Sequence, residues 1–217
     1  MYIVIVGAGG IGRRLTEIVI KDGNHNLVVI DKNQMACENV ARKYDVVAIN
    51  ADATQEETLE ESEIKKADVL VTTTKDDAVN IMVCSLAKNL GVKNLISVVN
   101  RDESKPMYIE KGVKLVKNPN TIMAEYLFKS IKHPNVEEYM NVGKYAEIFR
   151  ISIKPNSKLS GKTISKIGLP RKSLIVAIER AEKFIIPTDT VQLFSGDKVT
   201  ILSHKNQVDK VAELFLD

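Results

Sequence analysis

The stretch YIVIVGAGGIGRRL, residues 2–15, decides the fold of the first half of the chain. Its first five residues are apolar and rich in β-branched types, which is typical of a buried β-strand. Gly7, Gly9 and Gly12 follow at the spacing G-x-G-x-x-G, and from Gly10 onward apolar residues recur with the period of an α-helix. A strand, a glycine-rich turn and a helix in this order predict a dinucleotide-binding βα unit.

Each glycine of this motif has a physical task. Gly7 permits a tight turn, Gly9 lets the backbone approach a pyrophosphate, and Gly12 lets the helix pack closely on the strand. The free N–H groups at the helix N-terminus then face the phosphates. Asp31 ends the second apolar run about 20 residues later, where a carboxylate binds ribose hydroxyls and repels a 2′-phosphate. This pattern favours NAD, or another adenosine nucleotide without that phosphate, over NADP.

Strands and helices are predicted to alternate along the first 117 residues. Helical patterns separate the apolar runs, and one of them begins with a capping box of Thr54 and Glu57. Such alternation predicts a parallel sheet covered by helices on both faces. We therefore predict an α/β fold class in which residues 1–117 form a Rossmann-type doubly wound domain. The apolar runs of strand length are 2–6, 26–31, 46–49, 67–74, 94–99 and 114–116.

The rest of the chain divides into two parts. Residues 118–142 hold an apolar helix, expected over 119–132, and residues 143–217 predict a small C-terminal α+β domain with four strands and a final helix. The helix could belong to the core of the first domain. A helix that is apolar on nearly every side must be covered from several directions, so we expect a linking helix buried partly against a second subunit. Its apolar residues are Ile122, Met123, Ala124, Tyr126, Leu127, Phe128 and Ile131.

Further candidate ligand residues follow the ends of the predicted strands, where nucleotides bind in open α/β sheets. Asp52 follows the third strand and could bind an adenine amino group or cap the next helix. Thr73 and Thr74 follow the fourth strand and could contact ligand or cap a helix. Arg101 follows the fifth strand and could reach phosphates or pair with a surface acid.

Composition excludes several classes of function. The net charge is only +3, and Lys and Arg are interleaved with acids, which argues against a dedicated nucleic-acid-binding protein. No apolar run approaches the roughly 18 residues of a membrane-spanning helix, and no signal peptide precedes the first strand. Cys37 and Cys84 predict buried thiols of a reducing cytosol. No metal site is predicted, because His25, His133 and His204 lack ligand spacing.

These motifs in their order resemble the regulatory subunits of Trk- and Ktr-type potassium uptake systems, which are built from RCK (also called KTN) domains. The resemblance covers nearly the whole chain. It implies a Rossmann domain that binds NAD(H), or ATP and ADP, and an RCK C-terminal domain. It also implies dimers or rings beneath a membrane potassium channel or transporter subunit. The matching segments are VIVGAGGIG, VVIDKN, INADAT, VTTTKDDAVNIMVCSLAK, VVNRDE, VKNPNTIMAEYL, KLSGKTISKIGLP, IVAIER and IPTDTVQLFSGDKVTIL.

The resemblance also implies which residues hold the nucleotide, with Asp52 beside the adenine. Two positions depart from the family pattern. Ala51 stands where the family usually has glycine, and Gly10 stands where some ATP-responsive relatives have arginine, which favours NAD or NADH. The other implied contacts are Gly7, Ala8, Gly9, Gly10, Ile11, Asp31, Thr73, Thr74 and Arg101.

A small NAD-dependent dehydrogenase or reductase is the alternative function. Such an enzyme needs a proton donor or base near the nicotinamide. Lys75 lies near the expected edge of the sheet, but no Tyr-x-x-x-Lys pair accompanies it. We find no helix-turn-helix with a basic face that would indicate DNA binding. We therefore expect no catalytic residues and no enzyme activity, but a cytoplasmic nucleotide-sensing regulator held at the inner face of the membrane by its partner.

Overall fold

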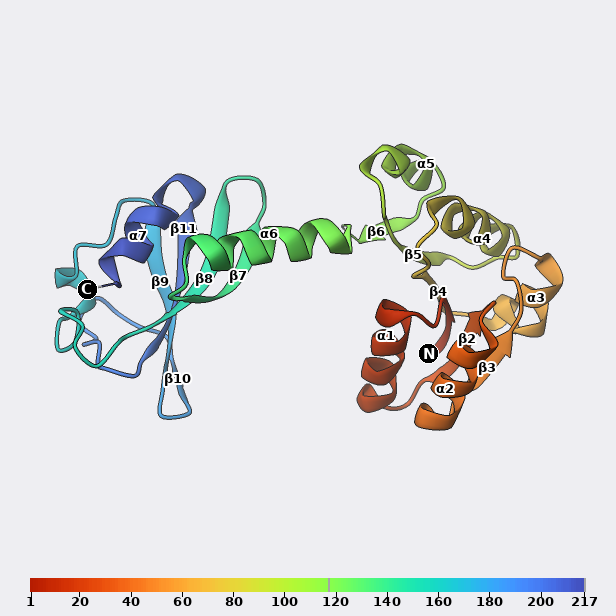
Figure 1. The fold of residues 1–217 in the computed structure, drawn as a ribbon, viewed down its shortest axis with the longest axis horizontal. Coiled ribbons are helices and arrows are strands. Elements are labelled where there is room, and N and C mark those ends of the chain that lie inside the picture. The colour runs from red at the N-terminus through yellow and green to blue at the C-terminus, as the bar shows by residue number, and fades with distance from the viewer. Residues whose placement is uncertain (117, 217) are drawn as a thin grey trace. The chain divides into compact units, whose positions relative to one another are not determined.

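The computed structural model describes residues 1–116 and 118–216, which form two compact units, Met1–Ile122 and Met123–Asp217 (Figure 1). The domain boundary expected at residue 117 lies outside the described residues. The division between the units falls inside a helix, α6 (Pro119–Lys132). No helix within the described ranges is long and apolar enough to cross a membrane.

The first unit is built on a six-stranded sheet in which every neighbouring pair is parallel. The strand order is β3-β2-β1-β4-β5-β6, so the direction of winding reverses between β1 and β4. This order is that of a doubly wound Rossmann sheet, and the predicted fold class is confirmed. The strands are β1 (Tyr2–Val6), β2 (Asn26–Asp31), β3 (Val47–Asn50), β4 (Val69–Thr72), β5 (Asn94–Val98) and β6 (Lys114–Val116).

Helices cover both faces of this sheet because side chains alternate along each strand. Ile3 and Ile5 of β1 pack on the face covered by α1 (Gly10–Asp22) and α2 (Gln34–Tyr44). Val4 and Val6 pack on the opposite face, where buried Tyr108 also lies. The helices and short turns of that face are α3 (Glu56–Glu61), η1 (Ile64–Lys66), α4 (Asp77–Asn89), η2 (Asp102–Ser104) and α5 (Lys105–Glu110).

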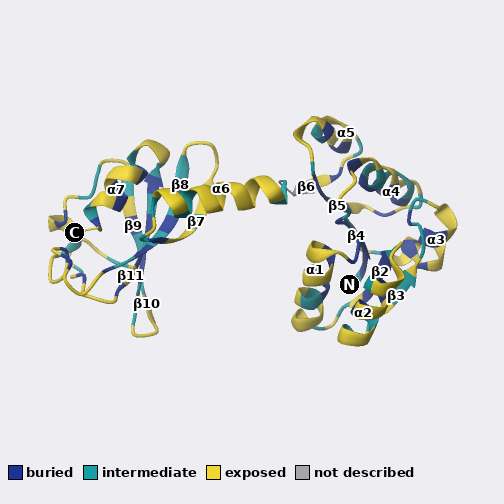
Figure 2. Cartoon of the chain, viewed as in Figure 1, coloured by how far each residue is buried: buried dark blue, intermediate teal, exposed yellow. Residues whose placement is uncertain are grey.

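The second unit is a five-stranded antiparallel sheet in the order β10-β9-β11-β8-β7, with the short helix α7 (Val208–Leu214) packed on it. Its core joins Val211 of α7 to Phe149 and Ile201 of the sheet, and the buried residues of this core are dark blue in Figure 2. The strands are β7 (Val136–Val142), β8 (Ala146–Ser152), β9 (Ser173–Arg180), β10 (Lys183–Ile185) and β11 (Lys198–His204), with a turn η3 (Ile164–Lys166) and a turn η4 (Lys205–Gln207).

Two local features differ from what the sequence patterns predict. Helix α6 has the predicted bounds 119–132, but the rest of the linking segment 118–142 contains strand β7, which was not predicted; Pro134 ends the helical stretch because it lacks an N–H. The prediction of a capping box at Thr54 is wrong, since the N-cap residue of α3 is Gln55, whose side chain makes no capping hydrogen bond. In addition, the two-residue turn between β9 and β10 has positive φ at Ala181 (+45°) and Glu182 (+64°), a conformation that Asn and Gly adopt more readily.

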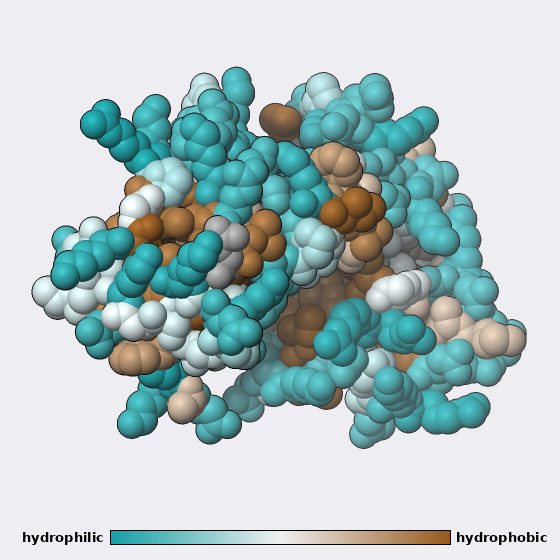
Figure 3. Space-filling view, turned by 60° about the vertical axis from the view of Figure 1, so that its left-hand side comes forward, coloured by the Kyte–Doolittle hydropathy of each residue, from teal (hydrophilic) through white to brown (hydrophobic). Residues whose placement is uncertain are grey.

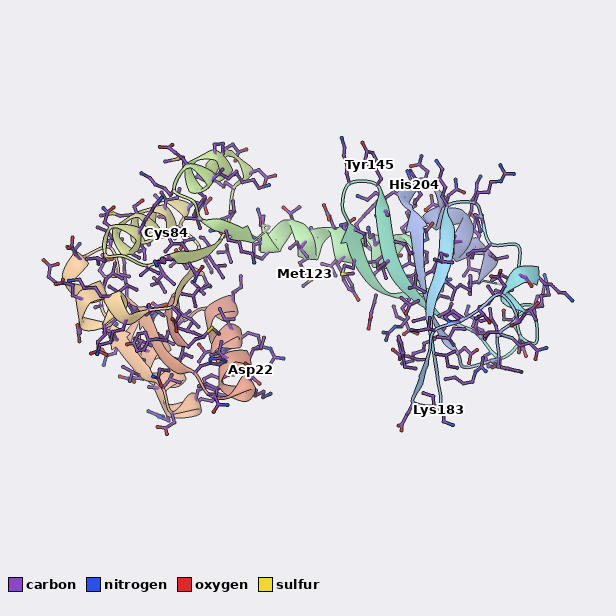
Figure 4. All side chains as sticks on the ribbon, turned by 180° about the vertical axis from the view of Figure 1, so that it is seen from behind. Asp22, Cys84, Met123, Tyr145, Lys183 and His204 are labelled. Atoms are coloured by element: carbon purple, nitrogen blue, oxygen red, sulfur yellow. The ribbon has the colours of Figure 1, made fainter. Side chains whose placement is uncertain are left out.

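Helix α6 has no buried residue among its 14 positions. Leu127, Phe128 and Ile131 are 56%, 64% and 77% exposed, and Met123 projects from the helix into solvent (Figure 4). Hydrophobic side chains also reach the molecular surface in the space-filling view of Figure 3. The alternative that this helix belongs to a hydrophobic core of the first domain is therefore wrong for the single chain.

Candidate functional site

A cleft of about 990 Å³ opens in the first unit at the carboxyl ends of the strands. It lies where the strand order reverses between β1 and β4, which is the expected ligand position in a doubly wound sheet. Its volume is at the upper end of the range for small-molecule sites. Eight of the predicted site residues line it: Gly7, Gly9, Gly10, Ile11, Asp31, Asp52, Thr73 and Thr74.

The glycines of the loop between β1 and α1 fall into two physical classes. Gly7 has a φ of +105°, and a Cβ at position 12 would lie 1.7 Å from the Gly7 carbonyl oxygen. The loop itself therefore requires glycine at both positions. Around Gly9 and Gly10 a Cβ would meet no atom within 4 Å. The open space at these two positions belongs to the cleft, and the exposed N–H groups at the start of α1 border it.

Asp31 connects the glycine loop to the loop that follows β2. Its Oδ2 accepts a hydrogen bond from the Ala8 amide at 2.6 Å, and its Oδ1 accepts one from the Asn33 amide at 2.8 Å. A carboxylate has about four acceptor positions, so two remain for ligand hydroxyls. The Ala8 amide is engaged by Asp31, and Ala8 shapes the loop instead of lining the cleft.

Asp52 lines the cleft and does not cap a helix, because the N-cap of α3 is Gln55. Its Oδ1 accepts hydrogen bonds from the Thr54 amide and hydroxyl at 2.9 and 2.7 Å, and its Oδ2 lies 3.1 Å from Lys32 Nζ. The Thr54 hydrogen bonds, assisted by Lys32, hold the pKa of Asp52 below its usual value. Asp52 therefore presents a charged acceptor to the cleft at neutral pH.

The two threonines after β4 secure the wall of the cleft. The Thr73 hydroxyl is 3.0 Å from the Gly7 carbonyl oxygen and fixes the glycine turn. The Thr74 hydroxyl donates to Asn80 Oδ1 at 2.7 Å. Neither threonine caps α4, whose N-cap is Asp76 with its carboxylate accepting main-chain N–H groups. The helix-cap interpretation is therefore wrong for both threonines, and their contact with a ligand remains a prediction.

Arg101 is exposed, and among the described residues it is Asn100, not Arg101, that lines the cleft. The main chain here is organised by Asp77, a buried carboxylate that the sequence patterns did not single out. It accepts hydrogen bonds from the Asn100 and Arg101 amides, both at 2.9 Å, and from the Tyr108 hydroxyl at 3.1 Å. Contact between Arg101 and phosphates remains a prediction.

The Asp77 environment shifts two pKa values. Burial by itself would raise the pKa of Asp77, but hydrogen bonds from Asn100, Ser104 and Arg101 outweigh it and hold the pKa below its usual value. Burial raises the pKa of Tyr108 to about 12, and the neighbouring Asp77 charge contributes. Asp77 therefore stays ionised and Tyr108 stays protonated at neutral pH.

The cleft contains side chains that were not predicted as ligand contacts, among them Lys32, Lys75, Asn100 and Asn120; of these, Lys75 was considered only as a proton donor. The first three lie one to three residues beyond β2, β4 and β5, so their position at the sheet edge was a usable signal. Asn120 lies at the start of α6, and no local pattern connects it with the glycine motif. Its place in the lining depends on the return of the chain to the sheet edge after β6.

Histidine and cysteine chemistry lies elsewhere. His25 pairs with Asp22, and His133 pairs with Asp209; neither histidine lines the cleft. Both cysteines are buried free thiols, and burial raises the pKa of Cys84 to about 11. Within residues 1–116 and 118–216, no group of three or more His, Cys, Asp or Glu side chains is placed to hold a metal ion.

Comparisons with known families cover both units. The model of the TrkA-N domain matches residues 3–119, and that of the TrkA-C domain matches residues 148–216. A Trk system potassium uptake protein TrkA homolog of Methanothermobacter thermautotrophicus is 32% identical over 216 residues, 99% of each chain. A homolog of Pyrococcus abyssi is 30% identical, covering 96% of this chain and 90% of its own. The chain spans 48% of the length of a Methanosarcina mazei homolog that is 28% identical.

Solved structures share the fold at low sequence identity. The RCK domain of GsuK is 16% identical with a TM-score of 0.65, and the match covers 100% of this chain and 48% of that one. The GsuK channel bound to NAD is 18% identical with a TM-score of 0.66, and the match covers 99% of this chain and 39% of that one. These likenesses confirm the RCK fold of the chain.

The two classes of glycine predict opposite effects of substitution. Gly12→Ala should lower the free energy of unfolding by about 3 kcal/mol or more, because its Cβ overlaps the Gly7 carbonyl. Gly9→Val should leave that free energy within about 0.5 kcal/mol, because the site is open and the backbone there is extended. Gly9→Val should nevertheless abolish NADH binding. Urea denaturation measures the free energies of unfolding, and calorimetry measures NADH binding. Normal NADH affinity in Gly9→Val would contradict the assignment of Gly9 to the nucleotide site.

Asp77 predicts a dependence of stability on pH. Because its folded pKa lies below the usual value of 3.8, its contribution is present above that value and is lost as the pH falls through the folded pKa. Asp77→Asn should cost about 2 kcal/mol at pH 7, since main-chain donors lose their acceptor. The difference from wild type should shrink in acid. Asp76→Asn, which retains a capping residue, is the matched control; equal losses in the two variants would refute the role of Asp77.

Proposed function

The chain belongs to the TrkA family, and from this membership we propose that it is a cytoplasmic regulatory subunit that binds NAD(H) and gates a membrane potassium uptake system. The observation that carries the proposal is the cleft at the strand ends of a chain matched by both TrkA domains. Gly9 and Gly10 line the cleft although the fold leaves room for a side chain at both positions, and a hydrogen bond from the Ala8 amide fixes Asp31 at the edge of the cleft. Relatives named as Trk potassium uptake proteins support the link to potassium.

The residues of the cleft suit a nucleotide with a free ribose 2′-hydroxyl. The N–H groups at the start of α1 would hold the pyrophosphate beside Gly9 and Gly10. Asp31 would accept hydrogen bonds from the ribose, and its charge disfavours a 2′-phosphate. Asp52 would accept from the adenine amino group. GsuK, a structural neighbour, has been solved bound to NAD and bound to ADP, so NAD(H) and ADP are the two ligands to compare.

Binding itself would be the output of this site. A general acid or base must lie within hydrogen-bond reach of the reacting atoms, and no histidine lines the cleft. Among the described residues that line the cleft, Lys32 and Lys75 are the remaining candidate proton donors. Lys32 is paired with Asp52 at 3.1 Å, and the groups beside Lys75 are threonines and a carboxylate whose hydrogen bonds hold loops. We therefore favour a nucleotide-dependent regulator over a dehydrogenase. The purified protein should not oxidise NADH when carbonyl compounds are supplied as substrates.

Regulation would require that the nucleotide binds one arrangement of the subunits better than another. Coupling energies of 1–3 kcal/mol are typical of such systems. The exposed apolar face of α6 favours an assembly of at least two copies, because monomers rarely expose large apolar patches. A homodimer or larger ring beneath a membrane potassium channel or transporter subunit is the arrangement we propose.

The Asp31 carboxylate should determine both affinity and ribose selectivity. Asp31→Asn should weaken NADH binding about tenfold, or about 1.4 kcal/mol, since a hydrogen bond to a charged carboxylate contributes about 1 kcal/mol more than one to a neutral amide oxygen and one acceptor oxygen is lost. It should also reduce the preference for NADH over NADPH. Calorimetry with both ligands measures this, and Asp22→Asn, at the far end of α1, is the control. An unchanged affinity and preference in Asp31→Asn would contradict the proposed ribose contact.

The apolar face of α6 predicts self-association. Phe128→Ser should shift the wild-type oligomer toward the monomer mass of 24.1 kDa, because a 64% exposed phenyl ring is removed from the interface. Met35→Ser, at a 71% exposed residue of α2, is the matched control and should leave the oligomer intact. Light scattering at micromolar concentration is the measurement. A wild-type monomer would exclude the proposed assembly.

Potassium flux tests the proposal as a whole. The chain is added to vesicles that contain the membrane transporter with which it co-purifies, and flux is recorded with NAD⁺, NADH, ATP or ADP. We expect flux to depend on the protein and to change with at least one nucleotide. Flux that responds to the protein but to no nucleotide would refute sensing, and flux that ignores the protein would refute the regulatory function.

A further inference from the structure

Asn100 lies between the cleft and the start of α6. Its side chain donates to the Thr74 carbonyl and to Asp77 Oδ1, both at 3.1 Å, while its amide donates to the same Asp77 oxygen at 2.9 Å. Thr74 and Asn100 both line the cleft. The main chain at Asn100 is therefore fixed by groups that border the proposed nucleotide site.

The side chain of Asn118 joins this network to α6. Its Nδ2 donates to the Asn100 carbonyl at 2.6 Å, while its Oδ1 accepts from the Asn120 amide at 2.9 Å and from the Thr121 amide at 3.4 Å. One amide thus starts the helix and also attaches it to the wall of the cleft. Because Pro119 has no N–H and Asn118 takes up the next two donors, the first turn of α6 is not an anion site.

The first turn of α6 also lines the cleft directly, through Pro119 and Asn120. The helix then continues through Ile122, where the first unit ends, to Lys132 in the second. In the second unit its Lys129 forms a 2.7 Å ion pair with buried Glu147, and its Tyr126 hydroxyl donates to the Glu137 carbonyl at 2.8 Å. The helix is therefore anchored by side chains within each unit.

We propose that Asn118 is a positioning residue that transmits occupancy of the cleft to α6 through its hydrogen bond to Asn100. This inference rests on the proposed nucleotide site and adds the route by which binding leaves it. A ligand that contacts Asn100, Pro119 or Asn120 changes the constraint on the first turn of α6. With the Asn118–Asn100 hydrogen bond intact, a shift of Asn100 also moves the Asn118 side chain that caps the first turn of α6. Without it, the helix start keeps its cap and loses its attachment to the cleft wall.

Two substitutions separate the cap from the attachment. Asn118→Ser and Asn118→Asp both keep an oxygen that caps α6, and neither can donate a side-chain amide hydrogen to the Asn100 carbonyl. Asn118→Ser adds no charge near the cleft. The matched control is Asn94→Ser, which breaks an equivalent 2.9 Å amide-to-carbonyl bond to Asp68 where β5 begins, at the opposite ends of the strands.

Hydrogen exchange of the α6 amides, with and without saturating NADH, tests the proposal in the full chain. In wild type and Asn94→Ser we expect NADH to slow exchange in α6 about tenfold, within the usual range of coupling. In both Asn118 variants we expect this slowing of exchange to vanish. Their NADH affinity, measured by calorimetry, should stay within about threefold of wild type, which is less than the tenfold change that corresponds to about 1.4 kcal/mol. Circular dichroism and thermal unfolding verify that α6 still forms.

The outcomes distinguish this inference from the proposed function. A full α6 response in both Asn118 variants would refute the role of Asn118 and leave the nucleotide site intact. NADH binding to wild type without any response in α6 would refute transmission through this helix. Absence of NADH and ADP binding to wild type would overturn the proposed function and this inference together.

Discussion

The carbonyl oxygen of Gly7 occupies the space that a side chain at position 12 would need, and the rest of the first unit depends on this contact. With a Cβ only 1.7 Å from that oxygen, α1 could not lie against the end of β1. The hydroxyl of Thr73, the residue after β4, donates to the same carbonyl, so the turn is held both by the close approach of α1 and by the end of the neighbouring strand. With the turn held in this way, the space beside Gly9 and Gly10 contains no protein atoms within 4 Å of a Cβ position, and this space is part of the cleft.

Two carboxylates then fix the loops around the turn by binding main-chain N–H groups. Asp31 holds the Ala8 amide, and Asp77 holds the amides of Asn100 and Arg101. Charged acceptors of this kind form stronger hydrogen bonds than neutral ones, and at Asp77 these bonds hold the pKa of the carboxyl below its usual value. The cleft is thus lined by loops whose positions are set before any ligand arrives, which reduces the entropic cost of binding.

Sequence reasoning succeeded where function and fold depend on neighbouring residues. The glycine spacing, the apolar runs and Asp31 at the end of β2 are local patterns, and the alternation of elements predicted the parallel doubly wound sheet that the structure has. It failed where a residue takes its role from a distant partner. Asp77 resembles an ordinary first-turn acid until β5 brings Asn100 beside it, and β7 is recognisable only through its pairing with β8.

The same distinction explains why α6 was predicted as an interface but not as a connection to the cleft. Its apolar composition is visible in any window of the sequence, whereas the bond from Asn118 to Asn100 spans 18 positions and joins two loops. Under the proposed function, nucleotide binding must bias an element outside the cleft, and a residue that bonds both to the cleft wall and to that element is placed to do so. The helix start meets that requirement, because the Asn118 side chain caps the helix and also bonds to Asn100, which lines the cleft.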